Sequence, residues 1–203
     1  MRVRTLFVGE VHGCASSLRA LLDQARPDRI LLLGDLFTKG PDPRGVWDII
    51  QERGCRAILG NHDARMLQVW NEPEDGKAHV ACRALPPEVQ AWVRALPLFV
   101  YGPGWIAVHG GLDPLLGVEG TSRRLALLLR RWPDDDDPAN PFWWRCYRGH
   151  ERVFYGHDAV RGLQVHARTV GLDTGAVYGG MLSGYLLEEE RVYQVAGHLP
   201  LVR

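Results

Sequence analysis

Five glycine-containing segments each follow an apolar run and carry side chains that can bind metal ions. They are Gly9-Glu10-Val11-His12-Gly13, Gly34-Asp35, Gly60-Asn61-His62-Asp63, His109-Gly110-Gly111 and Gly156-His157. Carboxylate, amide and imidazole donors without thiolates suit Mn²⁺, Fe or Zn²⁺ better than Ca²⁺ or a structural zinc site. The donors outnumber those that one ion needs, which indicates a pair of ions sharing one carboxylate. Such a pair lowers the pKa of a bound water to near 7 and clamps both ends of a displacement at phosphorus.

The elements that must position these donors alternate along the first half of the chain. Apolar runs at 3–8, 30–33 and 56–59 predict strands, and each stops at a glycine. Apolar residues recur at helical spacing over 18–25 and 43–50, between the strands. This order favours a parallel sheet with right-handed crossovers. The carboxyl ends of its strands would bring the donors to one crevice.

The second half of the chain has a different pattern. We expect short helices over 86–92 and 125–129, and a β-hairpin that pairs 98–101 with 105–108. Further short strands are expected at 153–155, 163–165, 181–187 and 192–195. Because the chain has no internal repeat and no long linker, residues 1–203 are expected to form a single domain with two sheets.

The charge balance limits the classes of partner. Lys plus Arg total 24 and Asp plus Glu total 24, so the formal net charge is zero. A neutral chain gives no electrostatic reason to expect nucleic acid or a membrane surface, so an anionic small-molecule substrate must be held by local cations or metal ions. No apolar run reaches the roughly 18 residues of a membrane span. The four cysteines are far apart and resemble the reduced thiols of a cytoplasmic protein.

Taken together and in order, the five segments resemble the signature of the calcineurin-like metallophosphoesterases, particularly the phosphoprotein phosphatase superfamily. The resemblance runs from Gly9 to Gly180. It implies an α/β fold, a four-layer αββα sandwich with two mixed sheets. It also implies one metal site from Glu10, His12 and Asp35, and a second from Asp35, Asn61, His109 and His157. Asp35 would bridge the two sites, and His62 would protonate the leaving oxygen.

Other segments are similar to the symmetrical diadenosine tetraphosphatases and related bacterial bis(5'-nucleosyl)-tetraphosphatases. Lys39 and Thr38 stand where the protein phosphatases usually carry Arg and Asp, and the stretches 155–158 and 171–180 also match this branch. The resemblance implies hydrolysis of dinucleoside polyphosphates by metal-bound hydroxide. It implies two divalent ions, Mn²⁺ first, with Fe, Zn²⁺ or Co²⁺ as alternatives. A Ser/Thr protein phosphatase with the same dinuclear centre is the alternative function.

Glu10 departs from the family pattern, which has Asp at this position. One extra methylene moves the carboxylate by about 1.5 Å, whereas metal–ligand distances are held to about ±0.2 Å. Glu10 is therefore a ligand with an adjusted backbone, the mark of a weakened first site, or not a ligand. A catalytically weakened nucleotide-binding module is the corresponding second alternative function.

Fixed cations are needed for the substrate phosphates. Lys39, beside the bridging carboxylate, is the first candidate, and Arg145 and Arg148 follow by loop position.

Three further residues each have two interpretations. Asp63 either orients His62 or caps a helix. Trp143 and Trp144 either stack a nucleobase, a contact worth about 1–3 kcal/mol, or pack in the core.

Overall fold

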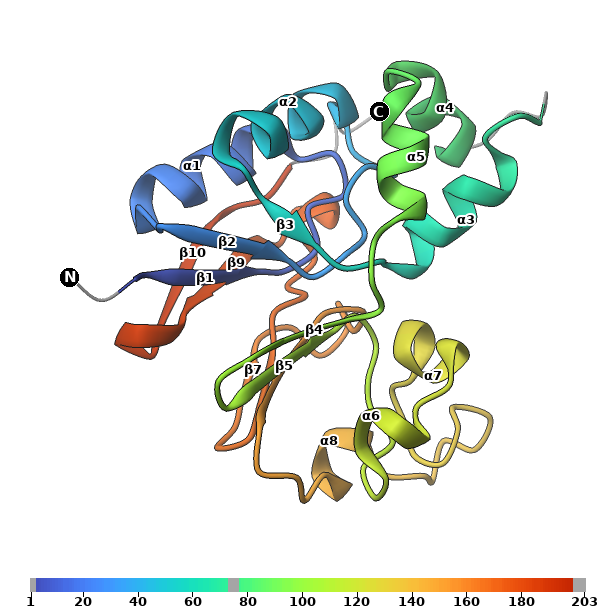
Figure 1. Ribbon diagram of the computed structural model, residues 1–203, viewed down its shortest axis with the longest axis vertical. Coiled ribbons are helices and arrows are strands. Elements are labelled where there is room, and N and C mark those ends of the chain that lie inside the picture. Colours follow the sequence, from blue (N-terminus) through green and yellow to red (C-terminus); the bar gives the residue numbers. More distant parts are fainter. Residues whose placement is uncertain (1–2, 73–76, 199–203) are drawn as a thin grey trace.

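The structure is a computed structural model that describes residues 3–72 and 77–198. Two five-stranded sheets lie against each other, and helices cover the outer surface of each sheet (Figure 1). Each sheet contains both parallel and antiparallel neighbours. This arrangement confirms the expected α/β sandwich with two mixed sheets.

The first sheet has the strand order β10-β9-β1-β2-β3, and β1, β2 and β3 run parallel as the alternating pattern predicts. The strands are β1 (Thr5–Val8), β2 (Arg29–Leu32), β3 (Arg56–Ala57), β9 (Met181–Leu186) and β10 (Arg191–Ala196). Helices α1 (Ala15–Ala25) and α2 (Pro43–Arg53) connect the parallel strands, and α3 (Asn61–Val69), α4 (Lys77–Ala84) and α5 (Glu88–Arg94) follow β3. The apolar faces of α1 and α2 pack on the outer surface of this sheet, which Figure 1 shows from the side.

The second sheet has the order β4-β5-β6-β8-β7. Its strands are β4 (Phe99–Gly102), β5 (Trp105–Val108), β6 (Arg152–Tyr155), β7 (Gln164–Val165) and β8 (Thr169–Gly171). The short helices α6 (Gly117–Gly120), α7 (Arg123–Leu128) and α8 (Trp143–Cys146) accompany it, and the 3₁₀ turns η1 (Ala176–Tyr178) and η2 (Leu187–Glu189) flank β9. The expected hairpin of β4 and β5 is present around residues 103 and 104.

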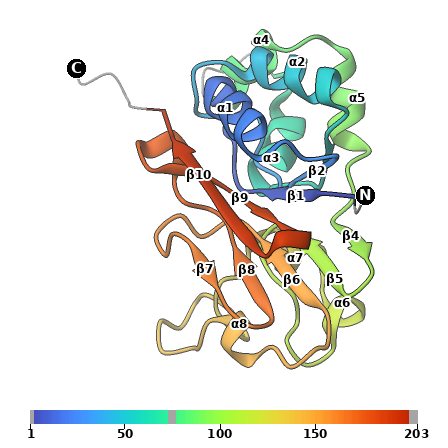
Figure 2. The same cartoon turned by 90° about the vertical axis from the view of Figure 1, so that its left-hand side faces the viewer.

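The two sheets face each other (Figure 2), and a layer of buried apolar side chains joins them. Phe7 of β1 stacks on Phe154 of β6, with ring centroids 3.7 Å apart and planes 2° from parallel. Tyr185 and Leu31 are buried in the same layer. This packing fixes the sheets relative to each other and brings the loops after β1, β2, β5 and β6 together.

Some elements differ from the expected ones. β3 is only two residues long; the Ile58 N–H still bonds to the Leu32 carbonyl of β2, but the Gly60 N–H, the next on that side, bonds to the Asp63 carboxylate instead. Helix α4 and strand β8 were not expected; β8 is a Thr-Val-Gly segment too short to show a period. Among the helices of the described residues, none combines the length and hydropathy of a membrane span.

Candidate active site

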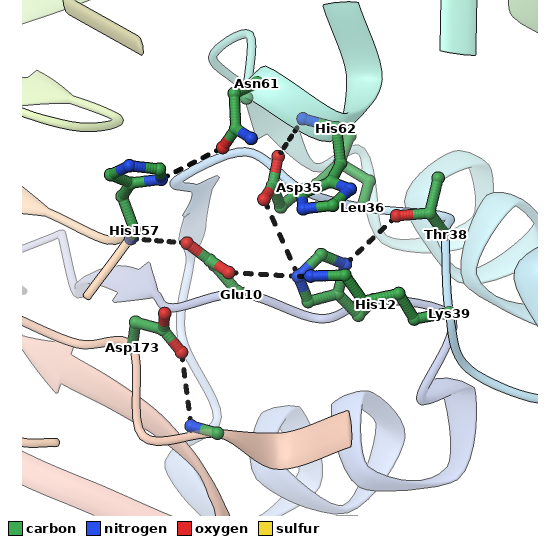
Figure 3. Close-up of polar contacts among 12 residues, drawn as sticks. Glu10, His12, Asp35, Leu36, Thr38, Lys39, Asn61, His62, His157 and Asp173 are labelled. Atoms are coloured by element: carbon green, nitrogen blue, oxygen red, sulfur yellow. Dashed lines mark hydrogen bonds and ion pairs between the residues drawn. The ribbon is translucent and has the colours of Figure 1, made fainter. Parts of the chain in front are cut away.

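The donors expected to bind metal converge in the loops that follow the strands and at the start of α3 (Figure 3). Two groups of three side chains each place their donor atoms within 4.8 Å of one another. The first group is Glu10, His109 and His157, and the second is His12, Asp35 and His62. The structure therefore brings these residues together, although the grouping differs from the two sites that the resemblance implies, because Glu10 groups with His109 and His157, and His62 joins His12 and Asp35.

Two carboxylates lie between the same two imidazoles. Asp35 places Oδ2 3.6 Å from Nε2 of His12 and Oδ1 3.6 Å from Nε2 of His109, as expected of a bridging residue. Glu10 places Oε2 3.0 Å from Nε2 of His12 and Oε1 3.8 Å from Nε2 of His109. Its Oε1 also accepts a hydrogen bond from the His157 N–H. The longer side chain of Glu10 thus reaches into the cluster rather than away from it.

Hydrogen bonds on the far side of two imidazoles fix which nitrogen faces the cluster. Nδ1 of His109 lies 2.7 Å from the carbonyl oxygen of Leu33. A carbonyl oxygen only accepts, so Nδ1 carries a proton, and in the neutral ring Nε2 presents a lone pair to the cluster. Nδ1 of His12 lies 3.2 Å from Oγ1 of Thr38, which likewise turns Nε2 inward. Such partners orient histidines that bind metals.

The donor atoms fit a bound cation because two of them bring lone pairs together and a third is buried without a partner among the described residues. Oδ1 of Asn61 lies 2.9 Å from Nε2 of His109, so an oxygen lone pair meets a nitrogen lone pair. The same oxygen lies 3.0 Å from Nδ1 of His157, whose Nε2 is buried with no hydrogen-bond partner among the described residues. A divalent cation would turn the lone-pair contact between Asn61 and His109 into coordination bonds and would give the buried Nε2 of His157 a partner.

The pKa values of the two carboxyl groups in the cluster also favour a bound cation. Burial, with a further contribution from Asp173, raises the pKa of Glu10 to about 8. Burial and the neighbouring Glu10 raise the pKa of Asp35 to about 8. Two carboxylates buried this closely resist ionisation until a cation compensates their charge.

The backbone holds several of these side chains in conformations that only tight turns supply. His12, Asp35, Lys39 and His157 have φ angles of 45°, 54°, 72° and 66°. Non-glycine residues adopt this left-handed region at a cost of about 1–3 kcal/mol, and they cluster at functional sites where the surrounding structure imposes it.

Asp63 provides part of that support. Its buried carboxylate accepts hydrogen bonds from the N–H groups of Asp35 at 2.8 Å, Leu36 at 3.0 Å and Gly60 at 3.1 Å. A Cβ at Gly60 would lie 2.2 Å from the Asp35 nitrogen, so only glycine lets α3 approach this turn. Asp63 anchors the Asp35 turn and the start of α3, and it makes no hydrogen bond to the His62 ring among the described residues. The structure therefore does not support the expectation that Asp63 orients His62 for catalysis, and it shows instead that Asp63 holds backbone N–H groups in place.

A cleft of about 590 Å³ opens beside the cluster. Lys39, Arg130, Asp173 and Tyr178 line it together with several of the donors. Nζ of Lys39 lies 3.2 Å from Nε2 of His12. Arg130 donates a hydrogen bond from its guanidinium to the carbonyl of His157 at 3.0 Å. Sequence analysis did not select Arg130, because it follows α7 outside all the glycine motifs.

Comparisons with known proteins identify the family. Residues 3–199 match the family model of the calcineurin-like phosphoesterases. The chain belongs to the calcineurin-like phosphoesterase family. A symmetrical bis(5'-nucleosyl)-tetraphosphatase from Aromatoleum aromaticum is 25% identical and covers 93% of this chain and 95% of its own. The asymmetrical bis(5'-nucleosyl)-tetraphosphatase PrpE from Oceanobacillus iheyensis is 24% identical and covers 96% and 93%.

Solved structures of phosphoesterases have the same fold as this chain. A crystal structure of a candidate diadenosine tetraphosphatase has a TM-score of 0.89 and 29% identity, and covers 97% of this chain and 94% of its own. The metallophosphoesterase from Sphaerobacter thermophilus has a TM-score of 0.65 at 18% identity, which shows the shared fold. Calcineurin-like phosphoesterases use divalent metal ions, and this chain is accordingly a metal-dependent phosphohydrolase whose converged donors are the candidate ligands.

In this phosphoesterase, the other expected substrate contacts lie elsewhere. Arg145 and Arg148 do not line the cleft among the described residues. The Arg145 guanidinium packs over the Trp144 ring, and Arg148 donates to main-chain carbonyls of its own loop. Trp143 is buried, while Trp144 stacks on His166 with ring centroids 4.4 Å apart. These residues of α8 and its surroundings stabilise the outer face of the second sheet (Figure 1).

His62 lies beside the carboxylates, and its backbone N–H donates to Oδ1 of Asp35 at 2.8 Å. The imidazole packs edge-on to that of His12, with centroids 5.1 Å apart. No carboxylate forms an ion pair with the His62 ring in the part of the chain that the structure describes. Burial and the nearby Lys39 lower the pKa of His62 to about 3.

Proposed function

We propose that this phosphoesterase hydrolyses phosphoanhydride bonds of dinucleoside polyphosphates, of which diadenosine tetraphosphate is the model compound. Two divalent ions would be held by Glu10, His12, Asp35, Asn61, His109 and His157. When bound, the ions lower the pKa of the attacking water and neutralise phosphate charge. Mn²⁺ is the first candidate, with Fe, Zn²⁺ or Co²⁺ as alternatives. A cytoplasmic reaction on a small molecule, without nucleic acid or membrane, is part of the proposal.

Fixed positive charges in the cleft would hold the polyphosphate. Lys39 stands next to His12, and its ammonium group offers a point charge to phosphate oxygens. Arg130 keeps guanidinium N–H groups free for a second phosphate after its bond to His157, since its contact with Asp135 is long, at 3.9 Å. A polyphosphate in the cleft would thus contact the positive charges of Lys39 and Arg130, although the formal net charge of the chain is zero.

The leaving group decides between an anhydride and a phosphoserine substrate. When water attacks phosphorus, the bond from phosphorus to the leaving oxygen breaks, and that oxygen takes the electron pair. A leaving phosphate has a second pKa of about 6 and departs without full protonation, whereas a serine alkoxide needs a strong general acid. Among residues 3–72 and 77–198, no carboxylate forms an ion pair with His62 that would keep it protonated, and the Thr38 hydroxyl contacts His12 instead. We infer that neutral His62 donates a hydrogen bond to the leaving phosphate, which suffices for an anhydride. The observation that supports an anhydride substrate is that no carboxylate of the described residues forms an ion pair with His62.

The test compares diadenosine tetraphosphate with a phosphoserine peptide, using protein loaded with Mn²⁺. We expect kcat/KM to be at least about a hundredfold higher for the dinucleotide, which corresponds to about 2.7 kcal/mol of transition-state stabilisation. Faster hydrolysis of the phosphopeptide would favour the protein phosphatase instead. The products also identify the bond that breaks, since symmetrical cleavage yields only ADP.

The Glu10→Asp variant tests the weakened-module alternative. Because Glu10 already lies among the donors, the native chain is expected to be active with Mn²⁺. An inert native chain together with an active Glu10→Asp variant would show that the first site is weakened.

A further inference from the structure

The 3₁₀ turn η1 holds one aromatic ring at the surface. The turn is flanked by Gly175 and Gly179, whose φ angles of 70° and 87° are left-handed, and the Tyr178 N–H bonds back to the Gly175 carbonyl at 2.9 Å. Ala176 and Val177 are buried beneath the turn, whereas Tyr178 is 60% exposed. The buried neighbours fix the backbone, so the exposed ring is presented rather than loosely tethered.

Tyr178 lines the cleft close to the metal ligands. Nζ of Lys39 lies 5.4 Å from the centroid of the Tyr178 ring and 3.2 Å from Nε2 of His12. The Lys39 ammonium group therefore lies close to both the Tyr178 ring and Nε2 of His12. Among the described residues that line the cleft, Tyr178 is the only Phe, Tyr or Trp.

Apart from the Lys39 ammonium group, which lies over the ring at 5.4 Å from its centroid, the exposed ring is available to a ligand. No other aromatic side chain of the described residues packs on Tyr178, and no hydrogen bond to its hydroxyl occurs among them. Trp143 and Trp144 are not available in this way, because one is buried and the other is sandwiched with Phe142 and His166.

We propose that Tyr178 is the platform on which a nucleobase of the substrate stacks, so that this residue selects nucleotides over bare polyphosphates. The inference rests on the proposed function. Lys39 lies between the ring and the imidazole cluster, where the phosphates of a stacked nucleotide must pass. Every nucleobase has a π face, so the platform selects for the presence of a base rather than for its identity.

The experiment compares two substrates that differ in the base. Diadenosine tetraphosphate and inorganic tripolyphosphate both contain anhydride bonds, but only the first carries adenine. For Tyr178→Ala, we expect the ratio of kcat/KM for the dinucleotide to that for tripolyphosphate to fall about tenfold or more, mainly through KM. Tyr178→Phe retains the ring and is expected to keep the ratio within about twofold of the native value. Tyr101→Ala is the matched control, because Tyr101 is 58% exposed at the end of β4 and does not line this cleft.

Two results would overturn the platform. If Tyr178→Ala slows both substrates equally, the ring acts only by positioning Lys39. If neither kcat/KM value changes, the base does not stack there.

A binding measurement separates this failure from that of the proposed function. In calorimetric titrations of the Mn²⁺-loaded protein, Tyr178→Ala should weaken ADP about tenfold relative to pyrophosphate. If the native protein hydrolyses tripolyphosphate but not diadenosine tetraphosphate, the proposed function fails. Tyr178→Ala then still decides the platform through ADP: preferential weakening supports it, and equal weakening of ADP and pyrophosphate refutes it.

Discussion

Replacement of Asp63 by alanine should destabilise the protein and weaken its metal site without touching a metal ligand. The change removes the acceptor of three buried N–H groups, at about 1–3 kcal/mol each. Burial and the neighbouring Asp35 raise the pKa of Asp63 from 3.8 to about 6, so at pH 7 keeping this carboxylate ionised in the folded state destabilises the native protein by about 3 kcal/mol. The alanine variant does not have this destabilising charge, so it regains part of the lost stability. The free energy of unfolding should therefore fall by about 3 kcal/mol. The released Asp35 turn should also lower Mn²⁺ affinity about 10- to 100-fold.

Urea unfolding of the metal-free protein and calorimetric titration with Mn²⁺ measure the two effects separately. Asp113→Ala is the matched control: Asp113 is buried and accepts bonds from the N–H groups of Leu115 and Leu116, both at 2.9 Å, but it does not line the cleft. It should lose stability while keeping native Mn²⁺ affinity. If Asp63→Ala binds Mn²⁺ as tightly as the native protein, or if both variants lose affinity equally, Asp63 does not position Asp35.

Two further predictions concern pH and the cleft. Glu10 and Asp35 have pKa values of about 8 in the folded protein against 4.5 and 3.8 ordinarily, so between pH 6.5 and 8 these two carboxyl groups bind more protons in the folded state than in the unfolded state. This effect outweighs the opposite contribution of His12, His62 and His157, whose pKa values burial lowers. The melting temperature of the metal-free protein should fall between pH 6.5 and 8, and saturating Mn²⁺ should abolish this fall; a rise with pH would contradict the burial of two uncompensated carboxylates. Arg130→Ala should raise KM for diadenosine tetraphosphate about tenfold in steady-state assays, whereas Arg145→Ala should leave KM unchanged. If Arg145→Ala raises KM and Arg130→Ala does not, Arg145 contacts the substrate as the sequence predicts.

The convergence of the candidate metal ligands could be predicted because each lies where a short-range signal is strong. Glu10, Asp35 and His157 follow buried strands that end at glycine, and parallel strand ends meet at one edge of a sheet. The hairpin and the helices with a clear apolar face could be predicted for the same local reason. β8 could not, because three residues carry no period.

Long-range contacts account for the remaining differences. Arg130 reaches the cleft only through the path of the chain after α7, and no motif marks it. Loop position alone favoured Arg145 and Arg148, but α8 turns them toward their own loop. The choice between two roles for Asp63 required the position of the Asp35 turn, which is 28 residues away in the sequence.

Anomalous scattering from crystals soaked in manganese tests the central claim most directly. The account predicts two peaks on either side of the Asp35 carboxylate, one contacted by His12 and the other by Asn61, His109 and His157. A map with no peak among these side chains, or with a single ion that leaves His109 and His157 uncoordinated, would contradict it.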